Sequence, residues 1–76
     1  MEYFKTSNLG LATALWASGF AIEDIDKSDR KEINIVFSDT IALCETEKKY
    51  WNNKLKVDAL DFFDKLSNLR TRLFNK

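Results

Sequence analysis

The chain has 76 residues, of which 45% are hydrophobic and 32% are charged, and its 12 basic residues balance 12 acidic ones. A chain this short buries only about 60% of the surface that its unfolded form exposes, so we expect one domain over residues 1–76 with a modest core. The apolar content is too high for a disordered chain, and the charged content is too high for a membrane protein. The balanced charge creates no overall field for nucleic acid or an anionic membrane, so such binding would need a local patch.

The reactive side chains limit the chemistry that the chain can perform. It has no His, and Cys44 is its single cysteine. An internal disulfide is therefore excluded, a zinc site would need carboxylates alone, and the usual general base near neutral pH is missing. We predict no catalytic residue, no metal ligand and no cofactor, and hence no enzyme. The lone cysteine and the lack of an export signal favour the cytoplasm.

The first predicted element is a helix over residues 7–18. Thr6, Ser7 and Asn8 are all good N-cap residues, and apolar residues then recur at helical spacing. Gly19 suits the left-handed conformation that ends many helices. Tyr3 and the residue after it allow a short strand before this helix.

Residues 20–37 predict a β-hairpin. The run K-E-I-N-I-V-F alternates between two faces, which is typical of a half-buried strand. In the preceding run the apolar residues change face between Ile22 and Ile25, so we expect a bulge near Asp24. Because a two-stranded sheet is marginally stable by itself, the hairpin needs either helical cover or strands from a second copy.

Two further helices complete the predicted fold. Thr40 and the two residues before it offer an N-cap for a second helix that runs to about Asn52, with Asn53 as its left-handed stop. Val57 and Asp58 open a third helix, whose first turns are acidic and whose last turns are basic, in accord with the helix dipole. The predicted class is α+β: helix, β-hairpin, helix, helix, with the helices packed on one face of a small antiparallel sheet.

Two charged residues interrupt the apolar arcs of the last two helices, Glu47 in the second and Arg70 in the third. Two alternatives are open: the pair forms an ion pair across the interface between these helices, or each side chain extends to solvent separately. The same projection puts Cys44 and Trp51 on the arc that faces the neighbouring helix. We therefore expect Cys44 to be a buried, unreactive thiol.

Three stretches carry a resemblance to a known family: F-K-T-S-N-L-G-L-A-T-A-L-W-A-S-G-F, I-N-I-V-F-S-D, and K-Y-W-N-N-K-L-K-V-D-A-L-D-F-F-D-K-L-S-N-L-R-T-R-L. Together they make nearly the whole chain similar to a family of small uncharacterised proteins from bacterial, phage and other mobile-element genomes, described only as a domain of unknown function. The chain departs from the pattern at Asn53, where Gly is usual after Y-W-N. The resemblance implies no catalytic residue and no cofactor. By association alone, it implies a protein that occupies the surface of a host protein, for example as an inhibitor of a defence nuclease.

The aromatic content suggests a partner surface, because two Trp, two Tyr and six Phe are many for so small a core. We predict a non-catalytic protein-binding module of phage or mobile-element origin that also self-associates as a homodimer. The predicted partner surface comprises Tyr3, Phe4, Trp16, Tyr50, Trp51, Lys54 and Phe74. The alternative is a nucleic-acid-binding accessory protein that uses the segment from Lys48 to Lys56, with an aromatic ring stacked on bases. The helical projection argues against that alternative because it turns Trp51 inward.

Overall fold

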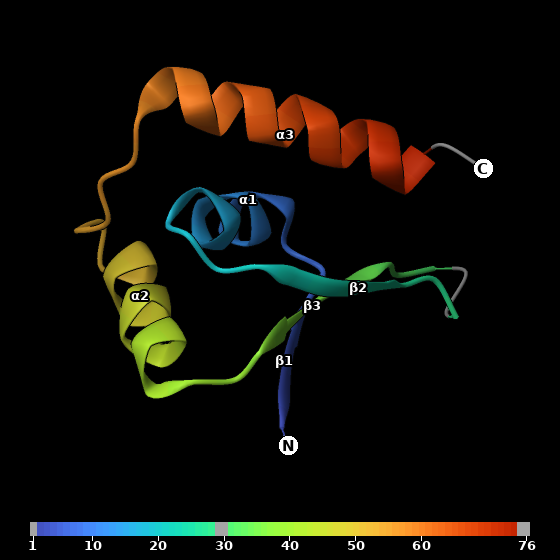
Figure 1. Ribbon diagram of the computed structural model, residues 1–76, viewed down its shortest axis with the longest axis horizontal. Coiled ribbons are helices and arrows are strands. Elements are labelled where there is room, and N and C mark those ends of the chain that lie inside the picture. The colour runs from blue at the N-terminus through green and yellow to red at the C-terminus, as the bar shows by residue number, and fades with distance from the viewer. Residues whose placement is uncertain (1, 29–30, 75–76) are drawn as a thin grey trace.

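The computed structural model describes residues 2–28 and 31–74. The elements in chain order are β1 (Tyr3–Thr6), α1 (Leu9–Ala17), β2 (Ile22–Asp26), β3 (Asn34–Ser38), α2 (Ile41–Trp51) and α3 (Ala59–Phe74). The strands form one antiparallel sheet in the order β1-β3-β2. Figure 1 shows α1 next to the sheet, α3 beyond α1, and α2 to one side. The predicted α+β class is confirmed.

The sheet contains the predicted hairpin and one more strand. β2 and β3 pair in antiparallel fashion, and their register shifts between Ile22 and Asp24, which confirms the expected bulge. β1 pairs with the other edge of β3, from Tyr3 opposite Ser38 to Thr6 opposite Ile35. The third strand therefore comes from the same chain, and the hairpin does not depend on a second copy for its support.

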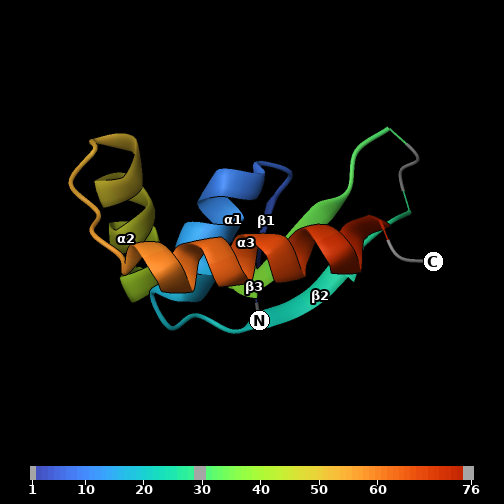
Figure 2. The ribbon, with the colours of Figure 1, turned by 90° about the horizontal axis from the view of Figure 1, so that it is seen from above.

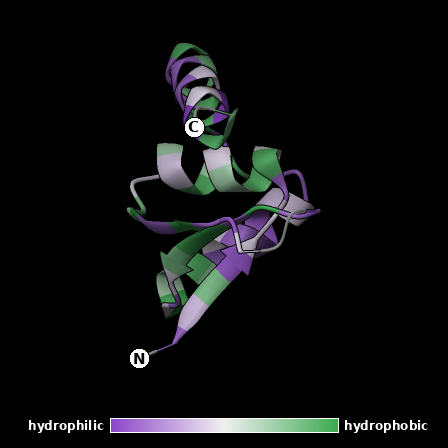
Figure 3. Ribbon diagram, turned by 90° about the vertical axis from the view of Figure 1, so that its right-hand side faces the viewer, coloured by the Kyte–Doolittle hydropathy of each residue, from purple (hydrophilic) through white to green (hydrophobic). Residues whose placement is uncertain are grey.

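Helix α1 is the central layer of the fold. Its residues Leu11–Leu15 are all buried, and a helix that is apolar on every side must be covered on every side. The sheet covers it through Ile35 and Phe37, and α3 covers it through Leu69. Figure 3 shows this stacking, with hydrophobic and hydrophilic residues alternating along α3.

Helix ends follow the local sequence closely. Asn8 and Thr40 cap α1 and α2 by accepting hydrogen bonds from backbone N–H groups three residues later. Gly19 has φ 105° and Asn53 has φ 58°, so both predicted left-handed stops are confirmed. After Asn53 the chain turns away from α2, because the Lys54 N–H donates back to the carbonyl of Lys49 at 2.8 Å.

Candidate functional site

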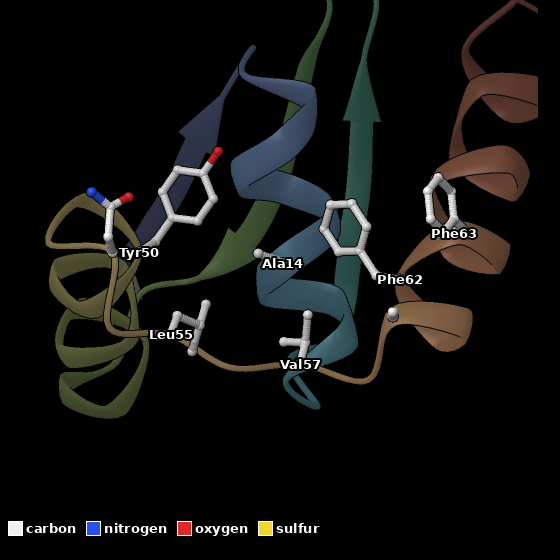
Figure 4. A pocket seen from close by; sticks show the side chains of 8 residues that line it. Ala14, Tyr50, Leu55, Val57, Phe62 and Phe63 are labelled. Carbon is white, nitrogen blue, oxygen red and sulfur yellow. The ribbon is translucent and has the colours of Figure 1, made fainter.

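A groove of about 430 Å³ lies where α1, α2 and α3 meet. Ala14 of α1 forms its floor, Tyr50 of α2 forms one wall, and Phe62 of α3 lies on the other side (Figure 4). The lining is mostly apolar. The complete lining is Ala14, Tyr50, Asn53, Leu55, Val57, Ala59, Phe62 and Phe63.

The segment between α2 and α3 closes one end of the groove. Leu55 and Val57 are half-buried and point into the groove, whereas Lys54, Lys56 and Asp58 are exposed (Figure 4). This alternation is that of an extended chain with one apolar side and one polar side. The lysine-rich corner of the sequence therefore carries an apolar lining on its inner side.

The position of Tyr50 depends on a glycine in α1. A Cβ atom placed on Gly10 would lie 2.8 Å from the Tyr50 hydroxyl oxygen, closer than real Cβ contacts allow. A glycine inside a helix costs about 1 kcal/mol relative to alanine. Here it makes room for the Tyr50 ring against α1, and that ring forms a wall of the groove.

The acidic groups around the groove are engaged in local contacts. The Glu47 carboxylate accepts a hydrogen bond from the Trp51 indole N–H at 3.3 Å, and the Asp58 carboxylate caps α3 at the Asp61 N–H, 2.9 Å away. Asp61 in turn pairs with Lys65 at 2.8 Å. In contrast, four exposed lysines at this corner form no side-chain hydrogen bond or ion pair with any described residue. These four are Lys48, Lys49, Lys54 and Lys56.

Two predictions about α2 are wrong. Trp51 is 57% exposed, and Cys44 is exposed rather than buried. The buried side of α2 instead contains Leu43 and the half-buried Tyr50, seven residues apart and therefore on one line of the helix. Trp51 contacts Tyr50 edge to face, with ring centroids 5.0 Å apart.

Of the two alternatives for Glu47 and Arg70, the described residues rule out the ion pair. No ion pair joins them among the described residues; Glu47 binds Trp51, and Arg70 is exposed. The physical reason is that α2 and α3 each pack mainly on α1 and not mainly on each other. The arcs that were expected to face each other face α1 instead.

The predicted partner surface is not one contiguous surface. Tyr50, Trp51 and Lys54 lie at the groove corner, but the other predicted residues lie elsewhere. Phe4 and Trp16 are half-buried against the core, and Trp16 has the Lys65 ammonium 5.6 Å and the Arg72 guanidinium 5.9 Å from its ring centre. The last two predicted residues are exposed far from the groove, Tyr3 on the sheet and Phe74 at the end of α3.

A second hollow, of about 340 Å³, lies on the sheet surface between Tyr3, Lys5 and the acidic residues of β2. Lys5 and Asp26 form an ion pair across it at 3.5 Å. The pKa of Asp26 lies below its ordinary value of 3.8, first because the Ser28 hydroxyl and N–H donate to this carboxylate and then because of Lys5. This hollow is polar, and its other two carboxylates, Glu23 and Asp24, accept hydrogen bonds from the Ser38 hydroxyl and the Ile25 N–H. We therefore regard the apolar groove as the candidate site.

Sequence reasoning missed most of the groove lining. Leu55, Val57, Phe62 and Phe63 did not enter the predicted surface, although the odd-even alternation of apolar and charged residues after Asn53 was a visible signal.

These features define a small α+β domain with an apolar groove at a helix corner. Among residues 2–28 and 31–74, no group of three or more His, Cys, Asp or Glu side chains could hold a metal ion. Nor does that part of the chain contain a helix with the length and apolar character needed to cross a membrane.

The chain belongs to the family called domain of unknown function DUF5659, whose model matches residues 1–75. This finding confirms the family resemblance. Neither the comparison with curated proteins nor the comparison with solved structures gave a match.

Proposed function

We propose that the protein is a non-catalytic protein-binding module and that the groove is its docking site. The proposed occupant is an acidic segment of another protein that inserts a large apolar side chain between Tyr50 and Phe62. The observation that carries the proposal is the apolar lining of the groove beside four exposed lysines that form no side-chain hydrogen bond or ion pair with a described residue.

The size of the groove fits a short segment with one or two anchor residues. A volume of about 430 Å³ falls in the lower part of the range of about 300–1,000 Å³ found for ligand pockets. Binding energy in protein interfaces concentrates in a few large side chains that fill such pockets. Tyr50, Leu55 and Phe62 offer apolar contact to an anchor of this kind.

Charge favours an acidic segment around the anchor. The carboxylates of Glu47, Asp58 and Asp61 are already bonded within the domain. Lys54 and Lys56 are exposed on the outer side of the segment that closes the groove, where they are open to a ligand. Acidic residues next to the anchor would be attracted to these lysines and would speed association.

The family resemblance adds an origin and a biological role to this proposal. In that extension the chain is encoded by a phage or mobile element, acts in the cytoplasm, and inhibits a host defence protein such as a nuclease complex. Inhibition is measured directly by adding the purified protein to a reconstituted defence nuclease. If a substitution that fills the groove abolishes the inhibition, the inhibition depends on the groove.

The docking proposal is tested by selecting ligands from a library of random displayed peptides. We expect the selected peptides to share one aromatic or leucine anchor flanked by Asp or Glu. Ala14→Leu fills the groove from its floor and should weaken their binding by about tenfold or more, the loss expected for a blocked anchor. Ala42→Leu makes the same chemical change at an exposed position of α2 and should leave binding unchanged.

Two outcomes would reject the docking proposal. One is a selection that yields no enriched peptide. The other is a set of peptides whose affinity is the same for Ala14→Leu, Ala42→Leu and the unchanged protein, because they would bind outside the groove.

A second candidate function is nucleic-acid binding, and the exposure of Trp51 is the observation that favours it. An indole that is 57% exposed beside four lysines resembles a base-stacking platform with phosphate contacts. Fluorescence anisotropy with a labelled single-stranded oligonucleotide tests it. Affinity that falls steeply with salt and is lost in Trp51→Ala would support this function, and no binding at low salt would reject it.

A further inference from the structure

One face of α3 carries large apolar side chains that no described part of the chain covers. Leu60, Phe63 and Phe74 are 78%, 66% and 79% exposed. They belong to a set whose members recur at intervals of three and four residues, the spacing that aligns side chains along one side of a helix. We call this set the outer stripe. It consists of Leu60, Phe63, Ser67, Arg70 and Phe74.

The outer stripe is distinct from the side of α3 that holds the helix in the fold. Leu69 is fully buried, and Phe62, Leu66 and Leu73 are half-buried against the rest of the protein. At about 100° per residue, Ser67 projects about 160° away from Leu69. Figure 2, seen from above, shows α3 in front with α1 behind it, so no other element covers the side of α3 that is opposite α1.

We infer that the outer stripe binds the outer stripe of a second copy, with the two α3 helices antiparallel and Ser67 at the two-fold axis. This alignment sets Leu60 of one copy opposite Phe74 of the other, and Phe63 opposite Thr71. Serine at the centre is small, so the helices approach closely there, while the large side chains fill the space toward both ends. The stripe is thus complementary to itself, as a two-fold interface requires.

Charge selects the antiparallel direction. Asp64 and Arg70 lie three residues on either side of Ser67, so the alignment sets each Asp64 against Arg70 of the other copy. Both side chains are exposed, and neither forms a hydrogen bond or ion pair with any described residue. A parallel pairing would instead set Arg70 against Arg70 and Asp64 against Asp64, which like-charge repulsion opposes.

The inference also accounts for the position of Arg70. A charged residue interrupts a line of apolar side chains, and its predicted partner Glu47 is bonded elsewhere. In the dimer its partner is Asp64 of the second copy. The dimer is a separate proposal from the docking site, because Tyr50, Leu55 and Val57 do not belong to the outer stripe. The two surfaces overlap at Phe63.

Sedimentation equilibrium of two charge-reversal variants tests the inference. In Asp64→Arg, the arginine at position 64 of each copy faces Arg70 of the other copy. In Arg70→Asp, the aspartate at position 70 of each copy faces Asp64 of the other copy. We expect the unchanged protein to dimerise as its concentration rises. Each variant alone should dimerise at least about tenfold more weakly, because like charges then oppose each other. Mixed in equal amounts, the two variants should form a heterodimer, and the double variant should regain self-association.

Circular dichroism checks that each variant keeps its fold, which the exposure of both positions favours. Trp51→Ala serves as the control, since it removes an exposed aromatic outside the stripe and should leave the dimer intact. A strictly monomeric unchanged protein at millimolar concentration would overturn the inference. So would a dimer that survives each single reversal, because it would use another surface.

Discussion

Gly10 and Tyr50 show how one residue pair shapes the groove. Replacing Gly10 with Ala would normally stabilise a helix by about 1 kcal/mol. Here the new Cβ would meet the Tyr50 hydroxyl oxygen at 2.8 Å, so the ring must move and the gain is cancelled or reversed. In a Tyr50→Phe background that oxygen is absent, and Gly10→Ala should stabilise the protein by about 0.5–1 kcal/mol.

Urea denaturation of the four proteins in this double-mutant cycle measures the coupling between Gly10 and Tyr50. Tyr50→Phe alone supplies the reference for the loss of the hydroxyl. Additive effects of the two substitutions would show that the hydroxyl does not restrict residue 10.

Hydrogen bonds from Ser28 lower the pKa of Asp26, an effect that the sequence does not predict. The Ser28 hydroxyl donates to its carboxylate at 2.6 Å and the Ser28 N–H donates at 2.9 Å, and these bonds hold the pKa of Asp26 below 3.8. A carboxyl with a lowered folded pKa adds stability above its unfolded pKa and loses it as the pH falls through the folded pKa. Asp26 therefore favours the folded state at neutral pH, and this contribution disappears only in acid, below pH 3.8.

Ser28→Ala removes the hydroxyl but keeps the backbone N–H. We expect the pKa of Asp26 to rise toward its ordinary value, so that protonation begins at higher pH; carboxyl carbon shifts in an NMR titration measure it. Ser38→Ala is the matched control, because the Ser38 hydroxyl donates to Glu23 instead. An identical Asp26 titration in Ser28→Ala would show that the hydroxyl has no part in the shift.

At the scale of the elements, local signals were predictable and relative orientations were not. The stops at Gly19 and Asn53, the Asp58 cap and the bulge near Asp24 all depend on a few neighbouring residues, and the structure confirms each of them. Asn53 adopts the left-handed conformation, with φ 58°, because asparagine is among the residues that tolerate it.

The orientation of α2 depends on its neighbour, which periodicity does not identify. The helical projection took α3 to be the neighbour of α2 and centred the buried arc near Cys44 and Trp51. Because α2 packs on α1, the buried line contains Leu43 and Tyr50 instead. The small residues Gly10 and Ala14 on α1 were a signal for this packing, since they admit the Tyr50 ring and leave the groove floor open.

At the scale of the whole molecule, the layered arrangement depends on how α3 attaches to α1. The uniformly apolar sequence of α1, L-G-L-A-T-A-L-W-A, requires cover on all sides, but the wide apolar arc of α3 does not by itself show which part provides that cover. The arc divides into a buried half that contains Leu69 and an exposed half that contains Leu60. Self-association through the exposed half would use the remaining apolar surface of the same helix.

Leu69 and Leu60 allow this division to be measured within one helix. Leu69 is 0% exposed, and Leu69→Ala should cost about 2–5 kcal/mol, a large share of the stability of about 4–11 kcal/mol expected for a domain of this length. Leu60 is 78% exposed, and Leu60→Ala should change the stability of the monomer by no more than about 0.5 kcal/mol. Urea denaturation at a concentration where the protein is monomeric separates these effects from any dimer. Equal losses for the two variants would contradict the arrangement, because they would mean that α3 packs on α1 through both of its faces.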